Sequence, residues 1–148
     1  MKIIFLDHQG VMYVKKHPKP GMLIDFDKEN IDLLNTILQT DENIEIVISS
    51  DWKYWVSLDE MQTFYKKQGI LKLPIAYTKP TKKYDLKIYA QQRANEIKTY
   101  LELADNITHW VSIDDIDMSK YLDNFVHISN VTLGLKQEGV SQLVLKYL

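Results

Sequence analysis

The sequence predicts an α/β protein with a mainly parallel, five-stranded sheet. Short apolar runs alternate with segments whose apolar residues recur at three- and four-residue spacing, which is the pattern of βαβ units. Three of the apolar runs stop at polar residues, namely Asp7, Ser49 and Asp114. Ligands of open α/β sheets bind beyond the carboxyl ends of the strands, so these side chains are expected at one edge. The 148 residues fit a single domain, residues 1–148.

The composition is that of an ordinary globular domain, with 45% hydrophobic and 26% charged residues. A net charge of −2 argues against a surface coated in positive potential for nucleic acid. The absence of cysteine excludes disulfides and thiolate metal sites. Without an apolar stretch of about 18 residues or a signal-peptide pattern, no membrane association and a cytoplasmic location are expected. Two lysine-rich groups follow expected strand ends: Lys15, Lys16, His17 and Lys19, and then Lys79, Lys82, Lys83 and Lys87.

The first strand is expected within Met1–Tyr13, where the apolar run ends at Asp7 and the turn residue Gly10 follows. Val11–Gly21 contains two prolines and four basic residues, which predicts an irregular flap over the strand ends. Asp27 is the expected N-cap of the helix that comes next.

The rest of the chain continues the alternation. The other expected strands are Ile44–Ile48, Pro74–Tyr77, His109–Ile113 and Asn124–Ile128. The expected helices cover Trp52–Gln68, with Gly69 ending it, the stripe from Ala90 to Ala104, and Gln137–Tyr147. Candidate buried positions of the first of these are Trp55, Leu58, Met61 and Phe64 or Tyr65.

Carboxylates at one sheet edge, without a histidine cluster or cysteine, form a hard-oxygen site suited to Mg²⁺. Such a site is typical of phosphate chemistry, because the ion neutralises and orients phosphoryl oxygens. Asp7 would be a metal ligand or a nucleophile, or else a strand-end residue that caps the next turn. Ser49, or its neighbour Ser50, is placed to hydrogen-bond a phosphoryl oxygen. Asp114 and Asp115 are further candidate metal ligands, with helix capping as their structural alternative.

Several stretches in chain order carry a family resemblance. They are Phe5-Leu6-Asp7-His8-Gln9-Gly10-Val11, Ile46-Val47-Ile48-Ser49, and Val111-Ser112-Ile113-Asp114-Asp115. They are similar to the first, second and fourth motifs of the haloacid dehalogenase (HAD) superfamily of phosphohydrolases. The segment from Arg93 to Leu101, with Ser49-Ser50-Asp51-Trp52-Lys53 and Leu133-Gly134-Leu135, resembles a HAD branch associated with RNA-repair proteins. The resemblance implies a Rossmann-like three-layer domain, Mg²⁺, and an aspartyl-phosphate on Asp7. Because the connections between the expected strands are short enough to hold only one helix each, no substantial cap domain is expected.

The family's third motif is a basic residue on the helix before the fourth strand. Arg93 is one candidate, and Lys87, near the start of the same helix, is the other. Arg93 would alternatively form a surface pair with Glu96 or Glu102.

The chain departs from the family at Gln9, which replaces the aspartate that acts as general acid and base. Glutamine cannot transfer the proton, a contribution worth roughly 10²–10⁴-fold in rate. The family's metal contact at this position comes from the backbone carbonyl, so Gln9 stays a candidate ligand. His8 titrates near neutral pH and would be a substitute, although neighbouring residues on an extended segment point in opposite directions.

The first hypothesis is therefore a Mg²⁺-dependent phosphomonoesterase without a cap, acting on a large phosphorylated substrate such as a nucleic-acid end. Gly10, Ser50 and Lys79 are its expected substrate-binding residues, and the lysine-rich groups would steer the substrate. The second hypothesis is a catalytically impaired phosphate-binding or interaction module, because of Gln9. A third is a metal-dependent nuclease with Asp7, Asp114 and Asp115 as its carboxylate cluster.

Overall fold

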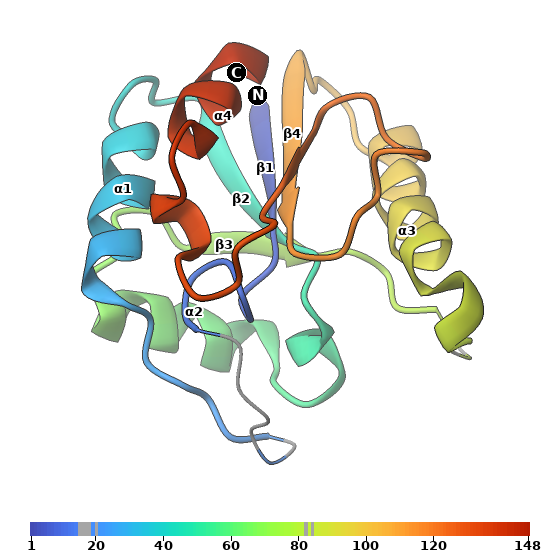
Figure 1. Cartoon of the computed structure of the whole chain (residues 1–148), viewed down its shortest axis with the longest axis horizontal. Helices are drawn as coiled ribbons and strands as arrows, with labels where there is room; N and C mark the ends of the chain where they lie inside the picture. The colour runs from blue at the N-terminus through green and yellow to red at the C-terminus, as the bar shows by residue number, and fades with distance from the viewer. Residues whose placement is uncertain (15–18, 20, 82, 84) are drawn as a thin grey trace.

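The computed structural model describes residues 1–14, 19, 21–81, 83 and 85–148. Five strands form one sheet in the order β3-β2-β1-β4-β5, and all neighbouring strands are parallel (Figure 1). The predicted sheet is thus confirmed. The strands are β1 (Lys2–Leu6), β2 (Ile44–Ile48), β3 (Pro74–Tyr77), β4 (His109–Asp114) and β5 (Phe125–His127).

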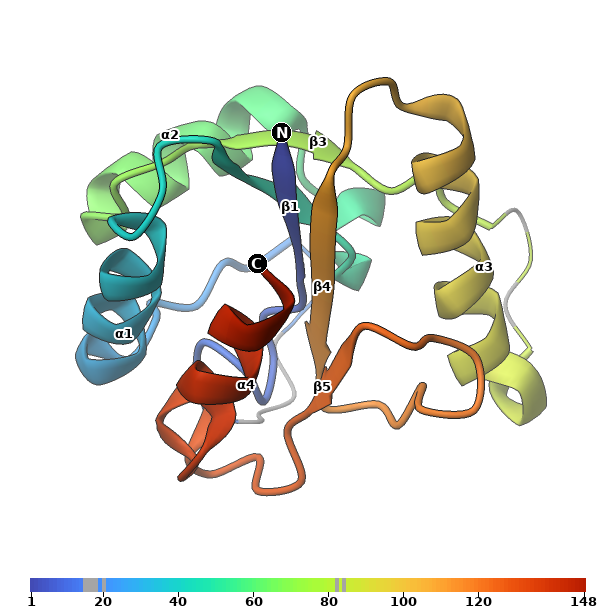
Figure 2. The same cartoon turned by 90° about the horizontal axis from the view of Figure 1, so that it is seen from above.

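Helices cover both faces of the sheet and make the three-layer arrangement that Figure 2 shows. The α-helices are α1 (Lys28–Leu38), α2 (Leu58–Gln68), α3 (Tyr89–Leu103) and α4 (Val140–Tyr147), and the 3₁₀ turns are η1 (Asp51–Tyr54), η2 (Leu86–Ile88) and η3 (Gly134–Lys136). Each connection between consecutive strands holds at most one α-helix, so no cap module is inserted within the described part of the chain. None of the described helices is long and apolar enough to cross a membrane.

Strand β1 lies at the centre of the sheet and joins the two halves of the core. Ile4 and Leu6 pack in the cluster that α1, α2 and α4 complete, whereas Ile3 and Phe5 pack in the cluster that includes α3. All four side chains are fully buried. Burial on both faces explains why this strand appears in the sequence as a continuous apolar run.

The predicted helix Trp52–Gln68 is wrong in its first part. The chain forms the turn η1 first, and α2 begins only after Ser57. The Ser57 hydroxyl accepts the backbone N–H of Glu60, and the Glu60 carboxylate accepts the backbone N–H of Ser57, which is a capping box. Trp55 therefore precedes the helix and is 50% exposed instead of buried.

The flap predicted for Val11–Gly21 is wrong in its first three residues, whereas Val14, Lys19 and Gly21 are exposed and irregular. Val11, Met12 and Tyr13 are buried in the main core cluster, because the turn that begins at Gly10 directs the chain back against the sheet. Asp27 precedes α1 in an extended conformation but caps it without a side-chain hydrogen bond. The predictions for residues 15–18 and 82, which include most of the first lysine-rich group, lie outside the described residues.

Candidate active site

The ends of the three central strands bring the predicted polar residues to one edge of the sheet. The Asp7 backbone N–H donates to the Ile113 carbonyl at 3.1 Å, and the Ser49 N–H donates to the Leu6 carbonyl at 3.1 Å. Asp114 is the last residue of β4. Asp7, Ser49 and Asp114 therefore leave neighbouring strands at the same level, as their positions in the sequence predict.

Three carboxylates gather at this edge. Asp7 and Asp114 are buried and Asp115 is partly buried, and one oxygen from each lies within 4.8 Å of the others. Octahedral Mg²⁺ holds oxygens at about 2.0–2.1 Å, which puts neighbouring ligands about 3 Å apart and opposite ones about 4 Å apart. The three oxygens lie close enough together for one such ion to reach all of them, and all are the hard ligands that it prefers.

Gly10 allows the close approach of this cluster to the loop after β1. Its φ is +77°, in the left-handed region, and a Cβ atom there would lie 2.9 Å from the Asp115 Oδ2. Its N–H donates to the Tyr13 carbonyl at 2.9 Å and closes the turn. The residue thus shapes the turn and makes room for the Asp115 carboxylate.

Arg93 lies inside the cluster and is 2% exposed. One guanidinium nitrogen is 3.2 Å from the Asp7 Oδ1 and 2.8 Å from the Asp114 Oδ2. The other donates to the Asp51 Oδ1 at 2.9 Å and to the Tyr89 hydroxyl at 2.6 Å. The alternative of a surface pair with Glu96 or Glu102 is therefore wrong.

The other candidate for the third motif, Lys87, occupies a different environment. It is exposed in η2, and its backbone N–H donates to the Asp85 carboxylate at 2.9 Å. The structure brings Arg93 to the carboxylates, whereas Lys87 stays on the surface of the connection before α3.

Burial and like charge raise the pKa values of the two buried carboxyls. Removal from water raises the pKa of Asp7 most, the Asp114 charge raises it further, and Arg93 opposes both. Burial likewise raises the pKa of Asp114, again against the effect of Arg93. Two buried carboxylates that share one guanidinium nitrogen form an environment that favours an additional cation.

Two buried donor groups at the site have no hydrogen-bond partner among the described residues. They are the Ser49 hydroxyl and the Arg93 Nε–H. Unsatisfied buried polar groups are rare, and each calls for an explanation such as a ligand. Ser50, the alternative to Ser49, is engaged locally, because its hydroxyl accepts the Trp52 N–H at 3.3 Å and caps η1.

His8 is buried in the core and does not substitute for an acid at position 9. Its Nε2 is 2.7 Å from the Tyr65 hydroxyl, and its ring packs against Phe26. Burial, with a smaller contribution from Arg93, lowers the pKa of His8 to about 3, so the ring is neutral near pH 7. Gln9 is partly exposed and forms a backbone bridge with Tyr13.

Lys53 and Asp51 carry no predicted functional role, and Glu96 is predicted only as an alternative surface partner of Arg93. The Lys53 ammonium is buried in an ion pair with Glu96 and donates to the Thr78 hydroxyl at 3.0 Å. Glu96 also accepts the backbone N–H of Thr81 at 2.6 Å. These partners are distant in sequence, so no local spacing pattern reveals them.

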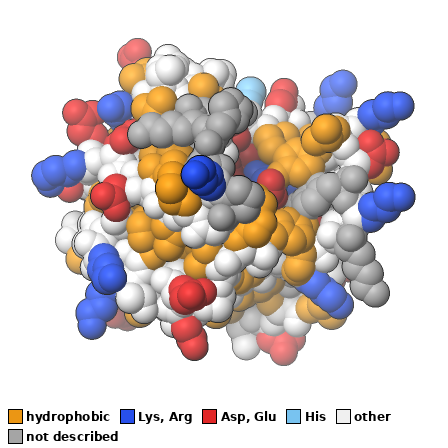
Figure 3. Space-filling model, turned by 90° about the horizontal axis from the view of Figure 1, so that it is seen from below, with side chains coloured by type: hydrophobic (Ala, Val, Ile, Leu, Met, Phe, Trp, Pro, Cys, Tyr) orange, Lys and Arg blue, Asp and Glu red, His pale blue; other side chains and the backbone are white. Residues whose placement is uncertain are grey.

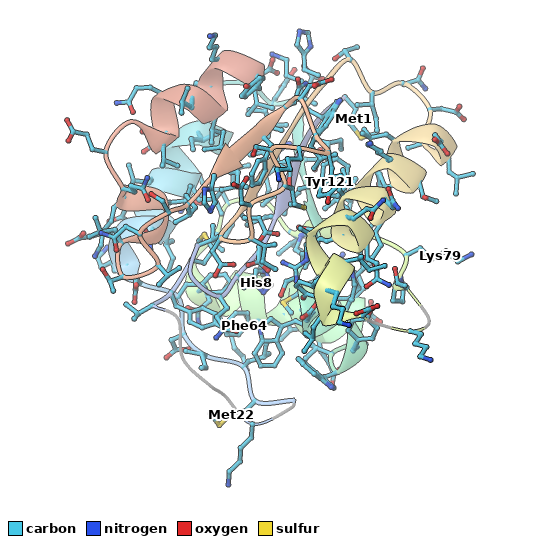
Figure 4. The ribbon with its side chains drawn as sticks, turned by 45° about the vertical axis from the view of Figure 1, so that its right-hand side comes forward. Met1, His8, Met22, Phe64, Lys79 and Tyr121 are labelled. Carbon is cyan, nitrogen blue, oxygen red and sulfur yellow. The ribbon has the colours of Figure 1, made fainter. Side chains whose placement is uncertain are left out.

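Lys79 lies one residue beyond Thr78 and is exposed. It lines a pocket of about 390 Å³ beside the C-terminal end of α3, together with Tyr77 and Tyr100. Figure 4 shows its side chain directed away from His8. The predicted substrate-binding residues are thus divided between the sheet edge, for Gly10 and Ser50, and this outer surface.

A Rossmann-like domain whose parallel strands end in clustered carboxylates, a serine and a buried arginine has the architecture of a HAD-type phosphohydrolase domain. The family described as the HAD domain in Swiss Army Knife RNA repair proteins matches residues 3–140. The chain belongs to this family, and the predicted resemblance is confirmed. Neither the curated proteins nor the solved structures that were compared with the chain give a match.

Proposed function

We propose that the chain is a Mg²⁺-dependent phosphohydrolase that cleaves phosphomonoesters through an aspartyl-phosphate on Asp7. The observation that carries this proposal is the buried Ser49 hydroxyl, which has no hydrogen-bond partner among the described residues and lies at the same sheet edge as the carboxylate cluster. A carboxylate nucleophile, a cation site and unused donors are the groups that phosphoryl transfer requires. Membership of the HAD superfamily supports the same reaction class.

In the proposed first step, an Asp7 carboxylate oxygen attacks phosphorus as the bond to the leaving oxygen breaks. The leaving alkoxide takes its proton from water, because the amide of Gln9 is too weak an acid to supply it. In the second step, water attacks phosphorus and loses a proton to the bulk solvent, the bond to Asp7 breaks, and inorganic phosphate is released. Ser49 and the Arg93 Nε–H would donate to phosphoryl oxygens and hold the group in place.

Asp7, Asp114, Asp115 and the Gln9 carbonyl would hold the metal ion. When bound there, Mg²⁺ supplies positive charge that neutralises phosphoryl oxygens. The Asp114 carboxylate also accepts the Ile116 backbone N–H at 2.9 Å, which fixes its orientation. Arg93 would offset the charge of the remaining carboxylate oxygens.

Gln9 limits the leaving groups that the site can expel. Without an acid, an aryl or acyl phosphate leaves readily, whereas an alkyl phosphate is expected to react roughly 10²–10⁴-fold more slowly than with an aspartate at this position. Gln9 also supports a second candidate function, a module that binds phosphorylated ligands without turnover. The two candidates differ in whether Asp7 ever becomes phosphorylated.

We propose a nucleic-acid end as the substrate of this site. The family description names RNA repair, and no inserted cap covers the strand ends in the described part of the chain. A domain without an inserted cap suits a phosphate at the end of a large molecule. The exposed lysines 79, 83 and 87 would attract a polyanion.

The test compares hydrolysis of p-nitrophenyl phosphate and of an alkyl phosphate by the parent, Asp7→Asn and Gln9→Asp, with and without Mg²⁺. We expect Mg²⁺-dependent hydrolysis of the aryl ester by the parent, its loss in Asp7→Asn, and faster alkyl-ester hydrolysis in Gln9→Asp. Asp117→Asn, which changes an exposed aspartate nearby, is the matched control. Undiminished activity of Asp7→Asn would contradict the mechanism. An inactive parent beside an active Gln9→Asp would support the binding module.

A further inference from the structure

Two aromatic side chains are exposed directly after the second motif. Tyr54 is 38% exposed and Trp55 is 50% exposed, at the end of η1. Trp55 packs edge-on against Trp52, with ring centroids 5.7 Å apart. The Trp52 indole N–H in turn donates to the buried Tyr13 hydroxyl at 3.3 Å. The Trp52 ring, which this hydrogen bond holds in place, therefore packs against one side of the Trp55 ring, and Trp55 itself is 50% exposed.

Tyr54 connects this aromatic pair to the connection between β3 and α3. Its hydroxyl donates to the Thr81 carbonyl at 3.2 Å, and the Lys53 ammonium lies 5.8 Å from its ring centroid. Residues 78–88 contain four lysines and one aspartate, although the whole chain has a net charge of −2. Exposed aromatic surface and local positive charge are thus joined within one part of the molecule.

Figure 3 views the face at which the carboxyl ends of the strands lie. Hydrophobic side chains gather across this face, and basic side chains stand mostly around its margin, where acidic side chains are interspersed with them. Among the exposed hydrophobic residues, Tyr54 and Trp55 follow β2, and Leu86 and Ile88 follow β3. These residues therefore leave the sheet at the same end as the carboxylate cluster.

We propose that Tyr54 and Trp55 form a base-stacking site for single-stranded nucleic acid. Every base has a face that stacks on an aromatic ring, and such stacking contributes about 1–3 kcal/mol per base, while lysines track the phosphates. A pre-positioned aromatic pair beside a lysine-rich connection fits this ligand. That the bound strand presents a terminal phosphate to Asp7 rests on the function proposed above, whereas the stacking site itself does not.

The test is fluorescence anisotropy with a labelled single-stranded RNA of about eight nucleotides that carries a terminal phosphate. The Asp7→Asn background in EDTA prevents turnover during the measurement. An abasic strand of equal length and charge reports phosphate contacts alone. Trp55→Ala and Trp55→Phe are compared in this background, and Leu71→Ala is the matched control, because Leu71 is 57% exposed before β3, at the other end of that strand.

We expect Trp55→Ala to weaken RNA binding about 5- to 150-fold, and Trp55→Phe to stay within about 3-fold of the parent. Leu71→Ala should bind as the parent does, and the abasic strand should bind weakly with no response to Trp55→Ala. Equal RNA affinity of Trp55→Ala and the parent would overturn the proposal, as would equal losses in Leu71→Ala. An absence of RNA binding would also overturn it and would leave this surface to a protein partner.

The outcome separates the two proposals. Trp55-dependent RNA binding by a protein that hydrolyses no phosphate ester would contradict the phosphohydrolase function alone. Hydrolysis of phosphate esters by a protein that binds the RNA and the abasic strand equally would overturn the stacking site alone.

Discussion

Helix α3 contributes one residue to each of two buried charge clusters, and the clusters differ in their balance. Glu96 forms a one-to-one ion pair with Lys53. The Lys53 ammonium also donates to the Thr78 hydroxyl, and the Glu96 carboxylate also accepts the Thr81 backbone N–H. One turn earlier, Arg93 places a single guanidinium nitrogen between the carboxylates of Asp7 and Asp114. Among the described residues, the first cluster sets one cation against one carboxylate, whereas in the second the single guanidinium of Arg93 faces the carboxylates of Asp7, Asp51 and Asp114.

We interpret the Lys53–Glu96 cluster as an ion pair that stabilises the fold, and the cluster around Arg93 as a functional site. Buried polar groups in a structural role are expected to be fully hydrogen-bonded, whereas groups that await a ligand keep unused donors and unbalanced charge. The Lys53–Glu96 pair ties η1 to α3, and so holds α3 where Arg93 reaches the strand ends. The carboxyl pKa values of Asp7 and Asp114 are raised, and the Ser49 hydroxyl at the same sheet edge has no hydrogen-bond partner in the described part of the chain.

The largest expected effect on stability comes from breaking the balanced cluster. Lys53→Met leaves the Glu96 carboxylate buried without its cation and should lower the free energy of unfolding by about 3–5 kcal/mol. Urea denaturation measures the change. The double variant Lys53→Met/Glu96→Leu should recover most of the loss, because no uncompensated charge is left. If Lys53→Met alone were as stable as the parent, the Lys53–Glu96 pair would not stabilise the fold.

The next largest effect is expected at Gly10, where the loop after β1 approaches the Asp115 carboxylate closely. Gly10→Ala places a methyl group against Asp115 at a positive φ and should cost about 1–3 kcal/mol, and it should weaken Mg²⁺ binding by displacing that carboxylate. Calorimetric titration with Mg²⁺ reports the second effect. Gly69→Ala is the control, since φ is also positive there but nothing lies within 4 Å. Equal loss of Mg²⁺ affinity in both variants would contradict the proposed role of Gly10.

Asp7→Asn should stabilise the metal-free protein by roughly 0.5–2 kcal/mol, because function and stability conflict at this residue. Its folded-state pKa is raised, so the folded protein keeps the proton longer and wild-type stability falls as pH rises from about 4 through that pKa. The gain should therefore be absent at low pH and grow with pH in EDTA-treated samples. Asp117→Asn should have the opposite sign, since a hydrogen bond from Ser119 lowers the pKa of Asp117. A pH-independent gain in Asp7→Asn would contradict the charge argument.

The smallest expected effect on stability is that of Ser49→Ala, which removes a buried hydroxyl that has no described partner and should change stability by less than about 1 kcal/mol. Affinity for inorganic phosphate in Mg²⁺ should nevertheless fall about 10-fold, as for the loss of a hydrogen bond to a charged group. Ser112→Ala is a close control, because Ser112 is also buried and unpartnered among the described residues but lies within β4. If both variants bind phosphate as the parent does, Ser49 has no part in the site.

Much of the fold follows from local sequence. The strands Ile44–Ile48 and Pro74–Tyr77 are predicted to the residue, because each is an apolar run between polar or turn-forming residues. The prediction of one helix starting at Trp52 is wrong, because apolar residues keep their helical spacing through η1 although the chain forms only a 3₁₀ turn there. The Ser57-x-x-Glu60 pattern is a local signal that marks the true start of α2.

The candidate site likewise contains residues that the sequence predicts and contacts that it does not. Asp7, Ser49 and Asp114 are predictable, because the ends of parallel strands meet at one edge. The pairs Lys53–Glu96 and Arg93–Asp51 join residues more than 40 positions apart, and only the packing of α3 against η1 brings them together. The neutral, core-bound state of His8 likewise depends on Tyr65 and Phe26, which sequence spacing does not place beside it.

The most direct test of the central claim is a crystal structure of the protein with Mg²⁺ and beryllium fluoride, which bonds to a carboxylate oxygen in the way that a phosphoryl group does. The account predicts beryllium fluoride on an Asp7 oxygen, with fluorines in reach of Ser49 and the metal held by Asp7, Asp114 and Asp115. Beryllium fluoride bound to another carboxylate, or a metal ion bound away from these three, would contradict it.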